Sequence, residues 1–126
     1  METASNKLAH GRKVLVVEDD AFVAFDIMTT LREAGAEILG PAFSLARAVE
    51  LVTIQDLDCA VLDVILRDGS VFPAARRLSQ RGVGLVFYTG RFDLGRLKTA
   101  WPGAQALLKP SSPDLLVKAV RAACSA

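Results

Sequence analysis

The chain has 126 residues, of which 52% are hydrophobic and 23% charged, and its formal net charge at pH 7 is +1. This length suits one domain with a single core. No stretch approaches the roughly 18–20 uninterrupted apolar residues of a membrane span. The near-neutral charge also lacks the clustered basic face typical of nucleic-acid binding. The composition therefore predicts one compact domain whose partners include neither nucleic acid nor a membrane.

The cysteines and the N-terminal residues indicate the compartment. Cys59 and Cys124 fit no metal-ligand or CxxC spacing, and Cys59 lies in a predicted core strand, where a reduced thiol behaves as a small hydrophobe. Residues 1–12 are polar and lack the apolar core of a signal peptide, so we predict a flexible N-terminal tail, in which a lone His10 is solvated. We expect a cytoplasmic protein.

The first predicted elements are a strand and a helix. Residues 13–17 are largely apolar and β-branched, and the strand ends at the acids Glu18, Asp19 and Asp20. From residue 21 to 35 apolar side chains recur at helical spacing, and Asp20 can cap the first turn. The apolar face of this helix comprises Ala24, Ile27, Met28, Leu31 and Ala34.

The next strand and helix occupy residues 37–53. Residues 37–43 have the pattern of a strand, but Pro41 removes a ladder donor and so confines this strand to a sheet edge. Ser44 can cap the short helix that follows. One face of that helix carries Leu45, Ala48, Val49 and Val52.

The third strand is the most informative stretch. An uncharged run, residues 59–62, leads directly into Asp63, as in a buried strand of a parallel sheet with helices on both faces. Burying an unpaired carboxylate there costs several kcal/mol, roughly, unless a cation lies beside it. Taken alone, the stretch equally allows Asp63 to cap the following turn, which we predict to be a loop over residues 66–70.

A third helix and a fourth strand come next. The helix carries Pro73 in its first turn, where proline is tolerated, and ends near Gly82. Residues 84–88 form the fourth predicted strand. This strand leads into Thr89 and Gly90.

The last part of the chain contains one weakly patterned segment, a strand and a helix. Residues 91–103 include glycine and proline and allow only a short or irregular helix over about 92–100. Residues 104–108 form the fifth strand, which ends at Lys109. Ser112, followed by proline, can cap a last helix. Its predicted core face comprises Leu115, Leu116, Ala119, Val120 and Ala123, with Val117, Ala122 and Cys124 off that face.

Five strands alternating with helices predict an α/β fold. Right-handed crossovers wind such a parallel sheet on both faces. If the second strand is an edge, the strand order is 2-1-3-4-5, the flavodoxin-like doubly wound arrangement. In this order the first and third strands are neighbours, and the ligand crevice lies between their carboxyl ends.

The order brings chemically active side chains to one edge of the sheet. Glu18 and Asp19 follow the first strand and come next to Asp63, while Thr89 and Lys109 follow the fourth and fifth strands. Three converging carboxylates repel one another unless a divalent cation binds, and hard oxygen ligands favour Mg²⁺. With that charge neutralised, Asp63 can attack a phosphoryl donor and form an acyl phosphate. A hydroxyl and a lysine suit the phosphoryl oxygens.

This set of residues resembles the receiver domain of response regulators in two-component signalling, over residues 13–123. The resemblance implies that Asp63 is the phosphoacceptor. It also implies that Asp19 and Asp63 bind Mg²⁺ directly, that Glu18 acts mainly through water, and that the backbone carbonyl of Ile65 is a further ligand. The implied donor is a sensor histidine kinase or a histidine phosphotransferase, and the domain is a signalling module rather than an enzyme.

The resemblance also assigns the phosphoryl contacts. Thr89 matches the switch hydroxyl and Lys109 the phosphate-pairing lysine, whose bond to the following proline is commonly cis in the family. The backbone of Gly90 is expected to contact the phosphoryl group. With residues 13–126 as the receiver domain and no output domain after them, the chain resembles stand-alone regulators that act on a downstream protein or relay phosphate.

Three positions depart from the common receiver pattern. Arg67 stands where many receivers have proline. Tyr88 precedes Thr89-Gly90 in a stretch similar to the Phe-Ala-Thr-Gly signature of the alphaproteobacterial "FAT GUY" receivers. Ala106 replaces the usual switch aromatic, so we expect the signal to travel through the backbone of residues 90–101, which we predict to be mobile until phosphate is bound.

Three other functions compete with this interpretation. A haloacid-dehalogenase-type phosphatase needs a second Asp two residues after the first, where this chain has Ile65. A flavodoxin-like cofactor protein needs a Gly/Ser/Thr-rich phosphate loop, but the acids after the first strand repel phosphate. The third alternative, a receiver-shaped interaction module that is never phosphorylated, conflicts with the intact acid, threonine and lysine set.

Overall fold

The core of the protein is a parallel five-stranded sheet. The structure is a computed structural model, which describes residues 11–54 and 56–124. The strand order is β2-β1-β3-β6-β7, which confirms the predicted order, with β2 at an edge. The strands are β1 (Lys13–Val17), β2 (Glu37–Ala42), β3 (Cys59–Leu62), β6 (Gly84–Thr89) and β7 (Gln105–Leu108).

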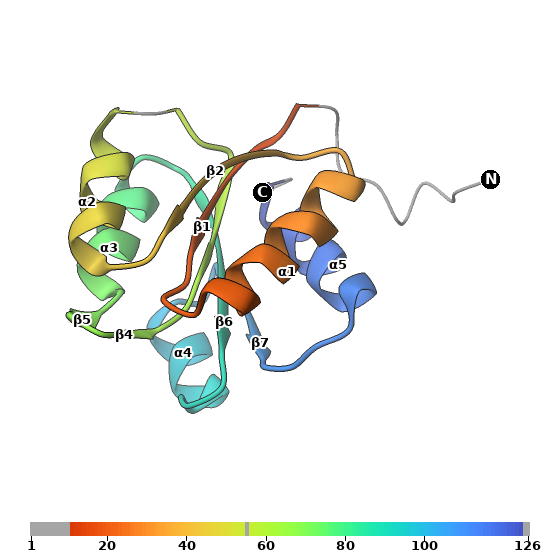
Figure 1. The fold of residues 1–126 in the computed structure, drawn as a ribbon. Helices are drawn as coiled ribbons and strands as arrows, with labels where there is room; N and C mark the ends of the chain where they lie inside the picture. Colours follow the sequence, from red (N-terminus) through yellow and green to blue (C-terminus); the bar gives the residue numbers. More distant parts are fainter. Residues whose placement is uncertain (1–10, 55, 125–126) are drawn as a thin grey trace.

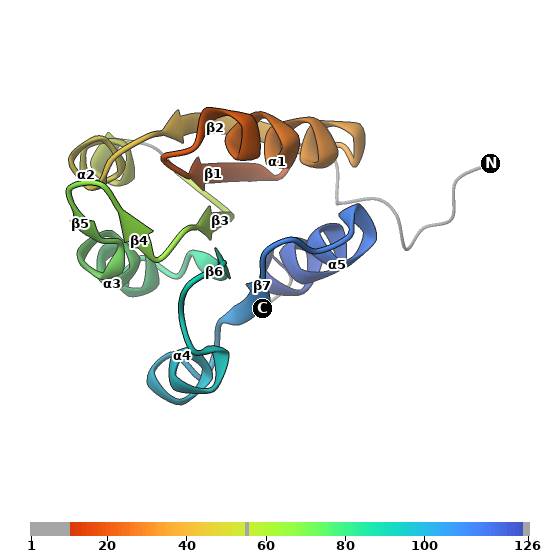
Figure 2. The ribbon, with the colours of Figure 1, turned by 60° about the horizontal axis from the view of Figure 1, so that its bottom comes forward.

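Helices cover both faces of this sheet (Figure 1). The helices are α1 (Ala21–Glu33), α2 (Leu45–Ile54), α3 (Phe72–Gln80), α4 (Leu94–Ala100) and α5 (Pro113–Cys124). Figure 2 shows α1 and α5 on one face and α2 and α3 on the other, with α4 beyond them near β7. Among the described residues, no helix has the length and apolar character that spanning a bilayer requires.

The alternation of side chains along the strands divides the core into two layers. Val14 and Val16 of β1 pack with the buried residues of α1 and α5, whereas Leu15 and Val17 pack with those of α2, α3 and α4. Successive strand residues point to opposite faces, so a strand buried on both faces is apolar throughout. The predicted apolar face of α1 is buried at every position.

Three predicted helix caps are confirmed. Asp20 accepts hydrogen bonds from the backbone N–H groups of Phe22 and Val23 at the start of α1. Ser44 Oγ accepts from the N–H of Arg47 in α2. Ser112 Oγ accepts from the N–H of the third residue of α5 at 3.3 Å. Each side chain satisfies an N–H group that has no partner within its helix.

The buried face of α5 differs from the predicted one by one position. Leu115 was expected in the core and is 50% exposed, whereas Val117 was expected off the core face and is 6% exposed. Both assignments were wrong. The buried arc of α5 is centred on Leu116 and Val120. It extends to Val117, three residues before Val120, and leaves Leu115 outside. The prediction holds for Leu116, Ala119, Val120 and Ala123.

The segment after Asp63 is more ordered than the predicted loop. Ile65–Leu66 (β4) and Gly69–Ser70 (β5) pair as a small antiparallel hairpin. Gly69 has a φ of 139°, a conformation open to glycine and rare for other residues, and it closes the turn. Leu66 is buried in the core. The sequence predicted only a loop here, because strands of two residues are too short to give a periodic pattern.

Asp68 of this hairpin caps a distant helix. Its carboxylate accepts hydrogen bonds from the N–H groups of Leu45 at 2.8 Å and Ala46 at 3.1 Å, at the start of α2. These two backbone hydrogen bonds lower the pKa of Asp68. The cap therefore links the segment after the candidate phosphoacceptor to the neighbouring crossover helix.

Replacing Asp68 with asparagine should lower the melting temperature at pH 7. The folded-state pKa of Asp68 lies below the unfolded value, so its contribution is present above that value and is lost as the pH falls through the folded-state pKa. Thermal unfolding of wild type and Asp68→Asn should therefore differ at pH 7 and converge at acidic pH. The fully exposed Asp56 gives the matched control, Asp56→Asn. A constant difference across that range would contradict a charge-dependent cap.

The C-terminal end of α5 lies close to the start of β3 and β6. Cys59 and Cys124 form a disulfide, with Cα atoms 5.4 Å apart. The expectation of a reduced thiol at Cys59 is thus corrected, because residues 65 positions apart become neighbours only when α5 packs on the sheet. At Gly84, an added Cβ would lie 2.1 Å from the backbone oxygen of Ala123, so only glycine permits this close approach.

Two predicted segments had the weakest patterns, the N-terminal tail over residues 1–12 and the short helix over about 92–100. Residues 1–10 of the predicted tail, including His10, lie outside the described residues. Arg12 already belongs to the fold, since its carbonyl accepts from the N–H of Glu37 and its guanidinium pairs with Asp58 at 3.5 Å. The predicted short helix is confirmed as α4, capped by Asp93 through the N–H groups of Gly95 and Arg96.

Candidate functional site: an acidic cleft at the carboxyl end of the sheet

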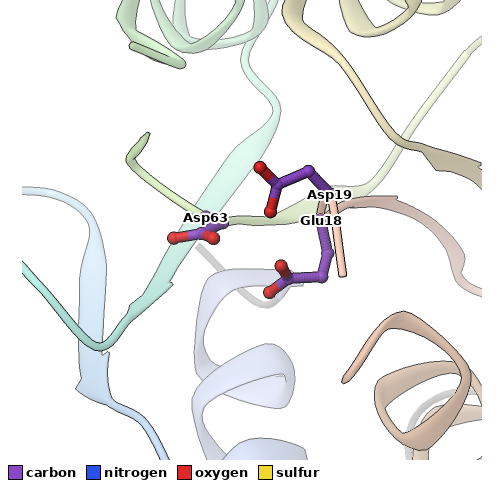
Figure 3. A group of neighbouring side chains, drawn as sticks. All are labelled: Glu18, Asp19 and Asp63. Carbon is purple, nitrogen blue, oxygen red and sulfur yellow. The ribbon is translucent and has the colours of Figure 1, made fainter. Parts of the chain in front are cut away.

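Three carboxylates meet where β1 and β3 end. Val17 of β1 is in register with Leu62 of β3, so the residues that follow the two strands lie side by side. Glu18, Asp19 and Asp63 each place one oxygen within 4.8 Å of the others (Figure 3). The sequence-predicted acid cluster is therefore assembled, by a parallel pairing that the β-branched strands favour.

Lys109 neutralises part of this cluster. Its ammonium donates hydrogen bonds to Glu18 Oε1 and, at 3.1 Å, to Asp63 Oδ2. The side chain reaches the acids from the end of β7, where the N–H of Lys109 donates to the carbonyl of Thr89. Sequence reasoning gave Lys109 a role only toward phosphate. The structure adds a second role, that of internal counter-ion for two carboxylates.

Burial sets the electrostatics of these groups. Glu18 is 1% exposed and Asp63 9% exposed. Burial raises the pKa of Glu18, although the hydrogen bonds from Lys109 and from the N–H of Asp20 act in the opposite direction. Burial alone would lower the pKa of Lys109, but its hydrogen bond to Glu18 and the charge of Asp63 outweigh that effect, and the net shift is upward. Lys109 is thus held charged.

The acids line a cleft of about 510 Å³. Ile65 and Gly90, both named from the sequence, also line it. Arg67 and Arg91 were not singled out as site residues, and they add two exposed cations to the walls. The only sequence signal for them was their position, a few residues after Asp63 and directly after Thr89-Gly90. The cleft combines an acidic floor with a cationic rim.

Thr89 lies at the predicted end of β6 but does not line the cleft. It is buried, and its hydroxyl accepts a hydrogen bond from the N–H of Arg91 at 3.4 Å. In this conformation the Thr89 hydroxyl is therefore not exposed to the cleft, and its own O–H remains available as a donor.

Tyr88 holds the loop that carries Lys109. Its hydroxyl accepts a hydrogen bond from the N–H of Ser111 at 3.0 Å, and the Lys109 ammonium lies 5.9 Å from the centre of its ring. The ring itself is buried between the sheet and α1 and α5. The Lys109–Pro110 peptide bond is cis, as the resemblance implied. Tyrosine in place of the alanine of the related signature thus adds a support for the β7–α5 loop.

The donor set fits Mg²⁺. Carboxylate oxygens are the hard ligands that this ion prefers, and the open cleft leaves room for the water molecules it retains. Glu18, Asp19 and Asp63 supply oxygens within reach of one another, and Ile65 lies at the same cleft. Lys109 bonds to two of these carboxylates, so a bound metal ion would share their charge with the lysine.

The chain is similar to curated bacterial regulators. It is 35% identical over 121 residues to the transcriptional regulatory protein PdtaR of Mycobacterium tuberculosis, covering 90% of this chain and 57% of PdtaR. It is 25% identical over 114 residues to the uncharacterized transcriptional regulatory protein YbdJ of Bacillus subtilis, covering 88% of this chain and 50% of YbdJ. The chain thus spans about half the length of the curated relatives it matches. No family model matches it.

Solved structures share the fold over nearly the whole chain. A response regulator receiver protein from Sinorhizobium medicae superposes with a TM-score of 0.83 at 23% identity, covering 92% of this chain and 96% of that one. The response regulator PhyR from Brucella abortus gives 0.81 at 22% identity, covering 96% and 50%. A putative response regulator from Chloroflexus aurantiacus gives 0.80 at 25% identity, covering 92% and 99%. The chain therefore shares the fold of response-regulator receiver domains, and over 90% of its length it is similar in sequence to the regulator PdtaR.

Proposed function

We propose that this domain accepts a phosphoryl group on Asp63, in a Mg²⁺-dependent reaction, from a phosphohistidine of a sensor histidine kinase or a histidine phosphotransferase. The observation that carries the proposal is the position of Asp63. Its carboxylate accepts a hydrogen bond from Lys109 and lies close to the carboxylates of Glu18 and Asp19 in the cleft. The proposed location is the cytoplasm.

In the proposed reaction an oxygen of the Asp63 carboxylate forms a bond to phosphorus, and the bond from phosphorus to the imidazole nitrogen of the donor breaks. The imidazole leaves with the bonding electron pair and takes a proton. Bound Mg²⁺ supplies positive charge for the phosphoryl oxygens and the carboxylates. Glu18, Asp19, Asp63 and the carbonyl of Ile65 are the residues that would hold it.

The other cleft residues receive the new charge. Lys109 can exchange its bond to Asp63 for one to a phosphoryl oxygen while keeping Glu18 as its partner. The N–H of Gly90 is a backbone donor at the cleft. Thr89 can donate its O–H to a phosphoryl oxygen while its hydroxyl oxygen still accepts from the N–H of Arg91. This pair of hydrogen bonds would couple phosphorylation to the start of the β6–α4 loop.

The proposed output is a change in residues 90–101, conveyed to a downstream protein or followed by onward transfer of the phosphoryl group. Support comes from Ala106, which cannot act as a switching ring, and from the hydrogen bond between the Thr89 hydroxyl and the N–H of Arg91 at the start of this segment. The likeness of the Tyr88 stretch to the "FAT GUY" signature stays a prediction. A receiver that is never phosphorylated is the alternative, and the experiment below distinguishes the two.

Phosphorylation should occur once, on Asp63, and only with a divalent cation. Incubation with Mg²⁺ and acetyl phosphate should add one phosphoryl mass by intact-protein mass spectrometry, and Asp63→Asn should remove it entirely. Omitting Mg²⁺ should have the same effect as the substitution. Asp56→Asn, at an exposed surface carboxylate, is the control that should retain the adduct. An adduct that persists in Asp63→Asn, or no adduct in wild type, contradicts the proposal.

A further inference from the structure

A second cavity lies away from the acidic cleft, between α3 and α4. It has a volume of about 530 Å³. Its apolar wall is formed chiefly by Phe72, Phe92 and Trp101, and Arg76 and Arg96 line it as well. It shares no lining residue with the cleft around Asp63. We call it the α3–α4 groove.

The rings of the groove fix one another in place. Phe72 stacks on Trp101 with ring centres 6.0 Å apart and planes 15° apart, and it meets Phe92 edge-on at 5.8 Å. Trp101 also contacts the buried Phe87 of β6 at 5.6 Å, which joins this wall to the core. Stacked and edge-to-face pairs of this kind stabilise the mutual arrangement of their rings. The rings therefore form a rigid apolar surface, and all three residues remain partly exposed.

The charge of the groove is one-sided. Arg76 and Arg96 are exposed, and no carboxylate lines the groove. Arg96 lies 5.6 Å from the centre of the Phe92 ring. Neither arginine forms an ion pair with another described residue, whereas Arg12 and Arg47 do. The nearest acid in the sequence, Asp93, already accepts from two N–H groups of α4.

We propose that the α3–α4 groove binds an acidic segment of a partner protein. One aromatic or large aliphatic side chain of that segment inserts against Phe72, Phe92 and Trp101, and flanking carboxylates pair with Arg76 and Arg96. The planar guanidinium matches a carboxylate through two parallel hydrogen bonds, and aromatic and arginine side chains are the groups that concentrate binding energy at interfaces.

The chemistry of the groove favours a peptide over a nucleic acid. The described residues that line the groove include no lysine, and the N–H groups of Gly95 and Arg96 at the start of α4 already donate to Asp93. The formal net charge of the whole chain is only +1. Binding to a polyanion draws mainly on many clustered cations. Two arginines beside an apolar wall suit a few carboxylates around one buried side chain.

The groove contains its own spectroscopic probe. Trp101 is the single tryptophan of the chain and forms part of the wall. We would select binders from a phage-displayed random peptide library on the unphosphorylated protein, then titrate the selected synthetic, tryptophan-free peptides while recording Trp101 emission. Enriched sequences should combine Asp or Glu with one aromatic or large aliphatic residue, and Trp101 emission should change saturably.

Charge reversal tests the role of the arginines. The double variant Arg76→Glu/Arg96→Glu should weaken binding of the selected peptide at least tenfold, and a peptide with Lys in place of its acids should bind this variant better than wild type. The control Arg32→Glu/Lys118→Glu changes two exposed cations on α1 and α5 and should leave affinity unchanged. Circular dichroism and urea unfolding of every variant verify folding without reference to phosphorylation, which keeps this test separate from the proposed function.

Several results would overturn the groove proposal. They are a library without enriched peptides, enriched peptides without acidic residues, unchanged affinity in the charge-reversed variant, and tighter binding of a single-stranded oligothymidylate than of any selected peptide. Because the assay uses unphosphorylated protein, its failure leaves the proposal for Asp63 intact. Conversely, absence of phosphorylation does not remove the groove.

Discussion

Replacing Lys109 with methionine should lower the free energy of unfolding of the metal-free protein by about 3 kcal/mol, the cost of breaking a buried ion pair on one side. The lysine ammonium is bonded to both Glu18 and Asp63, and its side chain is only 19% exposed. Methionine keeps the apolar length of the side chain and removes the charge. Two buried carboxylates then face each other and Asp19 without a counter-ion.

Urea unfolding in the presence of a chelator, followed by circular dichroism, measures this loss. Adding Mg²⁺ should recover part of it, because a bound cation replaces the missing charge and stabilises the folded state by linkage. Lys118→Met is the matched control, since Lys118 is exposed on α5 and should change stability by less than about 0.5 kcal/mol. Equal losses in the two variants would show that Lys109 is not the counter-ion of the cluster.

Replacing Gly84 with alanine should cost about 2–3 kcal/mol, although alanine is the smallest possible addition. The new Cβ would lie 2.1 Å from the backbone oxygen of Ala123 and 2.6 Å from its carbonyl carbon. Neither atom belongs to a flexible side chain, so α5 or β6 must shift to admit the methyl group. Overpacking of a well-filled core typically costs 1–3 kcal/mol, roughly.

The control for this substitution is Gly103→Ala. Gly103 has no heavy atom within 4 Å of an added Cβ and no positive φ, so the same change there should alter the free energy of unfolding by less than about 0.5 kcal/mol. Both variants are compared by urea unfolding at one Mg²⁺ concentration. If Gly84→Ala unfolds at the same urea concentration as wild type, α5 does not pack against β6 as closely as described.

Features that repeat along the chain could be predicted from the sequence. Apolar runs and helical spacing predicted the alternation of strands and helices and the α1 face, because these features depend on many residues that agree. The edge position of β2, and with it the strand order, was predicted from Pro41, which cannot donate to a sheet ladder. Capping by Asp20, Ser44 and Ser112 could be predicted because a cap acts on N–H groups only two or three positions away. The cluster of Glu18, Asp19 and Asp63 followed from strand order alone.

Features that depend on a single tertiary contact could not be predicted. Asp68 caps a helix that begins 23 residues earlier in the chain, and no local pattern connects the two. The pairing of Lys109 with Glu18 joins residues separated by 91 positions and depends on the path of one side chain. Val117 rather than Leu115 faces the core because α5 is rotated by its packing. The α3–α4 groove combines residues of two helices that sequence analysis treated separately.

The contacts of α5 give its two ends different freedom. At its last turn the helix is fixed to the sheet through Ala123 against Gly84 and through the disulfide to Cys59. Its first turn follows a loop in which the N–H of Ser111 donates to the Tyr88 hydroxyl and the Ser111 hydroxyl donates to the carbonyl of Leu108. We therefore expect a displacement of the Lys109 backbone to move the first turn of α5 more than its last turn. The fixed end of α5 thus lies at the start of β3, at the opposite end of that strand from Asp63.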